Sequence, residues 1–253
     1  MYVVEAADLH AVTPGNLLFK YADDTYVIIP ASNSHTRTLE LEHIETWSKA
    51  NNLNLNLSRT KSVEIIFTSK KCKVTTSTPP PLPGITRCST LKILGITVTN
   101  TLSVAEHVQD IIKLSSQTMH ALRTLCSYGM SATVIQHVFW TVVVFAKLSY
   151  ASQDWSGFTS AADLQRLNAF LCRSIRQGFC SPDRTDITVI FDAADEILFR
   201  NILSDGNHLL APLLPNEVRT PYHLSAMSHL RFYRAILSRV TVARQNRAIK
   251  SQV

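Results

Sequence analysis

Several features that define common protein classes are missing from this sequence. Its five cysteines are odd in number and widely spaced, and no two of them form a C-x-x-C pair. A disulfide framework and a C-x-x-C zinc site are therefore not indicated, and a reducing compartment is expected. The histidines do not form an HExxH motif, so the sequence does not predict a zinc site of that kind either.

The sequence also lacks a long apolar run. Its most apolar helical stretch, Val138 to Ala146, is interrupted by Lys147 and falls short of the roughly 20 residues needed to cross a bilayer. The first ten residues, MYVVEAADLH, include Glu5 and Asp8 but no Lys or Arg, which argues against a signal peptide. We therefore expect no membrane span and an intracellular protein, nuclear or cytoplasmic and not secreted.

The sequence does contain enough apolar material for a core. With 253 residues and 45% hydrophobic content, the chain can form one large domain or two small ones. Lys and Arg number 25 against 19 acidic residues, a formal charge of +6. This excess favours an acidic partner such as nucleic acid, although a charge of this size is also common on ordinary proteins.

The clearest chemical pattern lies between Asn16 and Pro30, in the stretch NLLFKYADDTYVIIP. Two β-rich segments flank Ala22, Asp23 and Asp24, which predicts an antiparallel hairpin. Its tip carries two adjacent carboxylates, and a hard divalent cation such as Mg²⁺ would relieve their repulsion. Taken alone, an Asp-Asp pair at a turn is more often simply solvated.

The string Tyr21-Ala22-Asp23-Asp24 in such a hairpin resembles the catalytic hairpin of reverse transcriptases. With its flanks, FKYADDTYVII looks like the form carried by non-LTR (LINE-type) retrotransposons. The resemblance implies an RNA-directed DNA polymerase that uses an RNA template, a DNA primer and dNTPs, with two Mg²⁺ ions bridging primer end and nucleotide. Asp23 would be the direct metal ligand and Asp24 the supporting one. Tyr21 and Ala22 would shape the turn beneath the primer terminus.

The resemblance continues downstream of the hairpin. Residues 52–61, followed by VEIIF, look like the next polymerase motif, in which Lys61 would lie near the nucleotide phosphates as a charge donor or acid. An ordinary surface lysine is an equally good interpretation. The stretch LKILGITV looks like the primer grip, so Leu91 and Gly95 would contact nucleic acid. Its apolar residues also fit a single core strand, Leu91 to Thr99, with Gly95 at a bend.

From Ser103 the sequence is typical of helices. Ser103 and Glu106 fit a capping box for a helix that ends at Gly129, and further helices are predicted at 131–150 and 160–178. We expect an α+β fold, with a partial polymerase palm of antiparallel strands and a helix over residues 1–100 and an α-helical thumb-like bundle over 101–180. Residues 181–253 would form a helical and basic extension, which either binds nucleic acid or is simply a solvated tail.

Two parts that the family's metal site requires are not found in the sequence. These are an aspartate on a strand upstream of the hairpin and a Pro-Gln-Gly segment, and Asp8 lacks the apolar and aromatic setting of the former. We therefore expect the C-terminal palm and thumb portion of a reverse transcriptase, inactive or nearly so alone, with weak Mg²⁺ binding. The alternatives are a non-catalytic nucleic-acid-binding remnant and a degenerate element copy that leaves a sheet edge and apolar surface uncovered.

Overall fold

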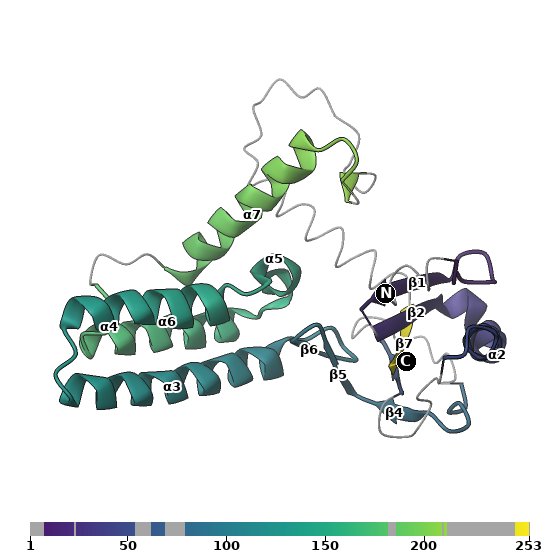
Figure 1. Ribbon diagram of the computed structural model, residues 1–253, viewed down its shortest axis with the longest axis horizontal. Helices are drawn as coiled ribbons and strands as arrows, with labels where there is room; N and C mark the ends of the chain where they lie inside the picture. The colour runs from purple at the N-terminus through teal and green to yellow at the C-terminus, as the bar shows by residue number, and fades with distance from the viewer. Residues whose placement is uncertain are drawn as a thin grey trace. The chain divides into compact units, whose positions relative to one another are not determined.

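The computed structural model describes seven stretches of the chain, the last of them by its backbone: residues 8–22, 24–53, 62–68, 79–181, 186–208, 210–211 and 246–252. These residues form a mixed α+β structure, which confirms the predicted class. The chain divides into two compact units (Figure 1). Unit 1 contains residues 1–93, 98–102 and 239–253, and unit 2 contains residues 94–97 and 103–238.

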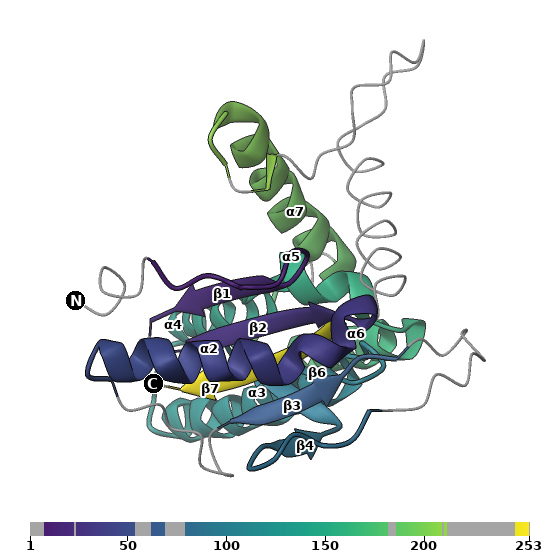
Figure 2. The ribbon, with the colours of Figure 1, turned by 90° about the vertical axis from the view of Figure 1, so that its right-hand side faces the viewer.

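Unit 1 is built on a five-stranded sheet in the order β1-β2-β7-β3-β4, which can be followed in Figure 2. Its strands are β1 (Leu17–Tyr21), β2 (Asp24–Pro30), β3 (Val63–Ile66), β4 (Thr86–Cys88) and β7 (Asn246–Gln252). β7 pairs antiparallel with both β2 and β3, whereas β3 and β4 are parallel. The segment predicted to be a helical and basic extension thus includes a central strand. Of residues 209–253, only 210–211 and β7 are among those described.

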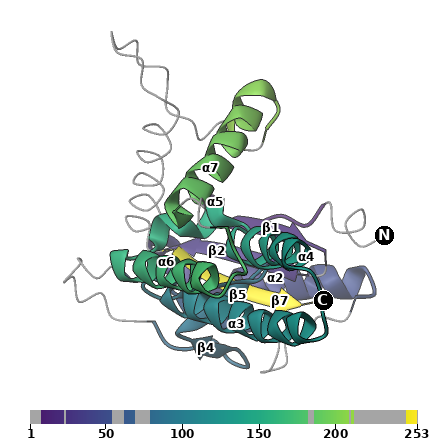
Figure 3. The same ribbon diagram turned by 90° about the vertical axis from the view of Figure 1, so that its left-hand side faces the viewer.

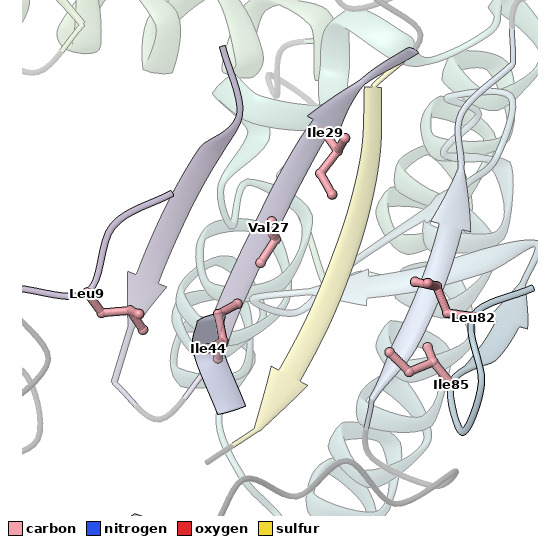
Figure 4. Packing of buried hydrophobic residues seen from close by; sticks show 6 residues of the cluster. All are labelled: Leu9, Val27, Ile29, Ile44, Leu82 and Ile85. Atoms are coloured by element: carbon pink, nitrogen blue, oxygen red, sulfur yellow. The ribbon is translucent and has the colours of Figure 1, made fainter. Parts of the chain in front are cut away.

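Helix α2 (Arg37–Ala50) covers one face of this sheet (Figure 2). The main apolar cluster lies between helix, sheet and loops, and Figure 4 shows its members: Leu9, Val27, Ile29, Ile44, Leu82 and Ile85. Val27 and Ile29 share a face because strand residues two apart do so, and Ile44 meets them from α2. Residues 31–36 form the 3₁₀ turn η1 (Ala31–Thr36), and α2 then begins without a side-chain cap.

A buried carboxylate joins α2 to the turn that precedes β1. Glu40 is fully buried and accepts hydrogen bonds from the backbone N–H groups of Val12 (3.1 Å) and Thr13 (2.8 Å) and from Asn16 Nδ2 (2.7 Å). Burial alone raises the pKa of Glu40, but the hydrogen bonds from Asn16, Thr13 and Val12 outweigh it, so the pKa lies below its ordinary value. The start of the hairpin is therefore fixed to the helix that covers it.

A second buried carboxylate, Glu64 on β3, holds together the start of α2 and strand β4. Its Oε1 lies 2.7 Å from Arg37 Nη1, and its Oε2 accepts from Arg87 Nε (2.9 Å) and Nη2 (2.7 Å). Both guanidiniums also donate to the carbonyl of Pro80 at 3.1 Å, which fixes this part of the loop before β4. Removing one partner of a buried ion pair costs about 3–5 kcal/mol, so this group is a major anchor of unit 1.

Unit 2 is helical. Its longer helices are α3 (Ala105–Ser127), α4 (Ala132–Val138) with its continuation η2 (Phe139–Leu148), α6 (Ala161–Arg176) and α7 (Ile187–Ser204). α3, α4 and α6 lie side by side, and α7 projects from them at a large angle (Figures 1 and 3). α3 and α6 run in the same direction, since the His107 ring meets Trp155 just before α6 at 5.0 Å and Met119 meets Ser174 later in both helices. Phe139 stacks on Phe170 at 6.5 Å and links η2 to α6.

Some local details of unit 2 differ from the sequence predictions. The capping box of Ser103 and Glu106 does not form, because Val104 occupies the N-cap position of α3 and its side chain makes no cap bond. A capping box does form at Ser160 and Asp163, where α6 begins. The predicted loop after the second helix contains α5 (Ser152–Trp155) and the 3₁₀ turn η3 (Ser156–Phe158).

The second helix is the most apolar element of unit 2. It changes from α-helical to π-helical hydrogen bonding at Phe139, and it buries Phe139, Val143 and Leu148 while Phe145 stays 71% exposed. Among the described residues, no single helix combines the length and the apolar character of a membrane span. One pair bent by 42°, Ala132–Leu148 with Ser152–Phe158, meets both criteria only when its two parts are counted together.

We predict that Glu40→Gln lowers the free energy of unfolding at neutral pH by about 2–3 kcal/mol, because an amide is a weaker acceptor for buried donors and introduces new N–H groups beside them. Since the folded-state pKa is lowered, Glu40 stabilises the fold above its ordinary value of 4.5, and this contribution is lost as the pH falls through the folded-state pKa. The difference in the free energy of unfolding between Glu40→Gln and the unaltered protein, measured by urea denaturation over this pH range, should therefore shrink as the pH falls.

The matched control is Glu42→Gln, because Glu42 is exposed on the same helix. It should change the stability by no more than about 0.5 kcal/mol at any pH. A deficit of Glu40→Gln that stays constant down to strongly acidic pH would contradict the role assigned to the Glu40 charge.

Candidate functional site

β1 and β2 form the predicted hairpin, with Tyr21 opposite Asp24 and a two-residue connection of Ala22 and Asp23. Ala22 has a φ of 51°, in the left-handed region that two-residue hairpin turns require. A residue with a Cβ in this region costs about 1–2 kcal/mol, so the paired strands hold the turn under strain. Asp23, the predicted direct metal ligand, lies outside the described residues.

Asp24 is the first residue of β2 and is half-buried. Its Oδ2 accepts a hydrogen bond from the Tyr26 hydroxyl at 2.8 Å, which fixes the direction of the carboxylate. Asp24 and Tyr26 alternate with Val27 and Ile29 along the strand, and the latter pair packs toward α2. The Asp24 carboxylate therefore belongs to the sheet face that α2 leaves open.

An apolar stripe lies on the same face beside this carboxylate. Leu17, Phe19 and Tyr21 alternate along β1 and are 48%, 52% and 63% exposed. β1 is at the edge of the sheet and pairs only with β2 among the described strands. An exposed apolar edge strand of this kind is a surface to which another chain or ligand can bind.

The stretch that looks like a primer grip folds as a second hairpin. β5 (Thr90–Ile93) and β6 (Ile96–Thr99) form a two-stranded sheet joined by Leu94 and Gly95, whose φ angles are 45° and 90°. Two successive positive φ angles are the signature of a type I′ turn. The prediction of one continuous strand with a bend at Gly95 is wrong, because the chain reverses direction there.

Tyr150 holds this turn in place. Its hydroxyl donates to the Leu94 carbonyl at 3.1 Å, and its ring lies 3.4 Å from the position that a Cβ on Gly95 would take. Leu94 is 42% exposed at the tip, whereas Leu91 is 5% exposed and packs against Ile65 in the core. The side chain available to a ligand is thus Leu94, which the sequence did not single out, and Leu91 is a core residue.

The donors available for Mg²⁺ come from the first hairpin. Within the described ranges, no three His, Cys, Asp or Glu side chains gather as a metal site, and Lys61 and Asp23 lie outside these ranges. The strand next to β2 is β7, whose sequence NRAIKSQ contains no acidic residue. One or two carboxylates suffice for Mg²⁺ when waters and substrate phosphates complete its coordination, and among the described residues of this hairpin Asp24 is the one with a carboxylate.

Comparisons of the chain with models of protein families, with curated proteins and with solved structures found no match. The structure therefore offers two tight hairpins from which a function can be inferred. The first carries the Ala22 turn and the Asp24 carboxylate, and the second has a Leu94-Gly95 turn in which Leu94 is exposed.

We predict that Ala22→Gly stabilises unit 1 by about 0.5–1 kcal/mol, because relief of the left-handed strain exceeds the extra chain entropy of glycine. Denaturant unfolding monitored by circular dichroism measures this. The control is Glu42→Gly, at an exposed position inside α2, which should destabilise by about 0.5–1 kcal/mol. If both glycine variants lose stability to the same extent, Ala22 is not strained in solution.

Proposed function

We propose that this chain is the C-terminal palm and thumb portion of a LINE-type reverse transcriptase, and that these 253 residues alone synthesise little or no DNA. The supporting observation is the Tyr21-Ala22-Asp23-Asp24 hairpin. Its turn brings the Asp24 carboxylate to the end of two paired strands, and the Tyr26 hydroxyl orients it. Asp23 precedes Asp24 directly in the sequence. An ordinary solvated Asp-Asp turn does not need a tyrosine to orient its carboxylate.

The order of elements after the hairpin is also consistent with this proposal. A helix, α2, follows the β1–β2 hairpin, which we call the carboxylate hairpin. The strands β3 and β4 come next, and then the Leu94-Gly95 hairpin. A series of helices from α3 to α6 comes next. In the proposed enzyme, unit 1 would belong to the palm, the Leu94-Gly95 turn would contact the primer, and the helices would form the thumb.

Each residue of the first hairpin has a proposed role toward an RNA template and a DNA primer. Asp23 and Asp24 would hold Mg²⁺, which when bound supplies positive charge to the phosphates of the dNTP. The backbone turn at Ala22 would lie beneath the primer terminus, and exposed Tyr21 would contact it. Lys61 would supply a further positive charge near the phosphates.

The low activity proposed for the chain alone follows from the number of carboxylates. Two adjacent carboxylates can hold a cation but cannot surround it, and the neighbouring strand β7 brings no acidic residue. Metal sites for in-line displacement clamp both the attacking and the leaving oxygen, which requires ligands from more than one direction. A misplacement of even 1 Å costs about 10²-fold in rate.

The test is primer extension on an RNA template with Mg²⁺ and dNTPs. We predict that the chain incorporates nucleotides at a rate at least about 10³-fold below that of a complete reverse transcriptase, because a catalytic ligand is missing. Any residual synthesis should be lost in Asp23→Asn. Glu42→Gln serves as the control with the same loss of charge, and it should leave that synthesis unchanged.

Robust Mg²⁺-dependent synthesis by these residues alone would overturn the proposal that the metal site is incomplete. Synthesis that survives Asp23→Asn would overturn the assignment of the hairpin itself. The two results are distinguishable because the first concerns the rate of the unaltered chain and the second its dependence on one carboxylate.

A further inference from the structure

A hollow of about 190 Å³ lies between α3 and α6 in unit 2. It is lined by Ser116, Met119, Arg123, Phe170, Arg173 and Gln177. Met119 and Phe170 are buried and form its apolar floor, whereas the polar members are exposed. The lining therefore combines two guanidiniums, a hydroxyl and an amide, and it contains no carboxylate.

The two arginines of this hollow differ from Arg166 and Arg200 of the same unit, which pair with acids. Arg166 pairs with Asp163 at 3.5 Å, and Arg200 pairs with Glu196 at 3.0 Å. In the part of unit 2 that the structure describes, neither Arg123 nor Arg173 pairs with an acid. Two like charges that line one hollow repel each other, and an anion between them would remove the repulsion.

The surrounding sequence adds to the positive charge. From Ser115 to Ser127 α3 contains no acidic residue, and the same holds for α6 from Leu164 to Arg176. Both stretches lie toward the C-terminal ends of their helices, where backbone dipoles are equivalent to about half a negative charge. Arginine is favoured there in any helix, but two full positive charges exceed this partial charge and leave the hollow net positive.

We propose that this hollow binds a phosphate group through Arg123 and Arg173, with Ser116 and Gln177 as further hydrogen-bond donors. Guanidinium groups bind phosphate oxygens in pairs of parallel hydrogen bonds, which suits two arginines facing one ligand. The volume is several times the 30 Å³ or so that one water occupies in the liquid, so a phosphate and bound waters fit. The phosphate comes either from a nucleic-acid backbone or from a small free phosphate.

This assignment is independent of the polymerase proposal, because it uses neither the carboxylate hairpin nor catalysis. The experiment uses the full chain at low ionic strength and two probes, inorganic phosphate and a single-stranded oligonucleotide. Binding is measured by calorimetry and fluorescence anisotropy. The variant Arg123→Ala/Arg173→Ala is compared with Lys113→Ala/Arg176→Ala, which removes two positive charges from exposed positions on the same helices outside the hollow.

We expect the pocket variant to weaken binding of at least one probe by about tenfold or more, through loss of charge-assisted hydrogen bonds, and the control variant by less than about threefold. Loss confined to inorganic phosphate identifies a small free phosphate as the ligand, and loss that extends to the oligonucleotide identifies a nucleic-acid backbone. An equal loss of affinity in the two variants, or no binding of either probe by the unaltered chain, would overturn the proposal that the hollow binds phosphate.

A second measurement needs no substitution. In the unaltered protein, the Nε–Hε NMR signals of Arg123 and Arg173 should shift on addition of inorganic phosphate, and those of Arg176 and Arg200 should not. Uniform shifts of all four signals would contradict a defined site. Primer extension is not involved, so the pocket and the polymerase proposal can fail separately.

Discussion

The carboxylate hairpin keeps its place in unit 1 because Glu40 is ionised and buried. Two backbone N–H groups and the Asn16 amide converge on this carboxylate, whose side chain is itself fully buried. The same Asn16 donates to Thr36 Oγ1 at 3.0 Å and accepts from Asn33 Nδ2 at 3.0 Å, so η1, α2 and the turn before β1 form one polar network. Hydrogen bonds to a charged group contribute about 1.5–3 kcal/mol each to the stability of the fold. The network is therefore comparable to an apolar cluster in its contribution to stability.

Both hairpins with proposed functions depend on backbone conformations that side chains disfavour. Ala22 and Leu94 each have positive φ without being glycine, and Gly95 completes the second turn. A strained backbone conformation of this kind persists where contacts with the surrounding structure hold it in place. Such conformations are common at binding and catalytic sites. At the second turn the determining contact is the Tyr150 hydroxyl on the Leu94 carbonyl. At the first it is the pairing of Tyr21 with Asp24 on the flanking strands.

Regular apolar patterns made much of the architecture predictable. The β-rich segments on either side of Ala22, Asp23 and Asp24 correctly predicted β1 and β2. The helix predicted at 160–178 corresponds to α6, whose capping box at Ser160 and Asp163 depends only on local spacing. The carboxylate hairpin was predictable for the same reason, because a two-residue turn between β-rich segments is a local feature.

What the sequence could not predict depends on contacts between distant residues. The sequence predicts a strand through Leu94 and Gly95 because leucine is an unusual first residue for a type I′ turn, and the Tyr150 that holds the turn is 56 residues away in the chain. The insertion of β7 between β2 and β3 joins residues more than 180 positions apart, which no local pattern reports. The Glu40 and Glu64 clusters were missed because a buried acid looks like an exposed one in the sequence.

The proposed function requires Asp23 and Asp24 to form a weak divalent site that lacks a partner carboxylate. The most direct measurement is Mn²⁺ titration of the isotope-labelled chain, followed by the paramagnetic broadening of backbone amide signals. Broadening should centre on residues 21–26, saturate at metal concentrations on the order of 1 mM as expected for few carboxylates, and disappear in Asp23→Asn/Asp24→Asn. Broadening that is absent from residues 21–26, or that persists in the double variant, would contradict a metal site formed by Asp23 and Asp24.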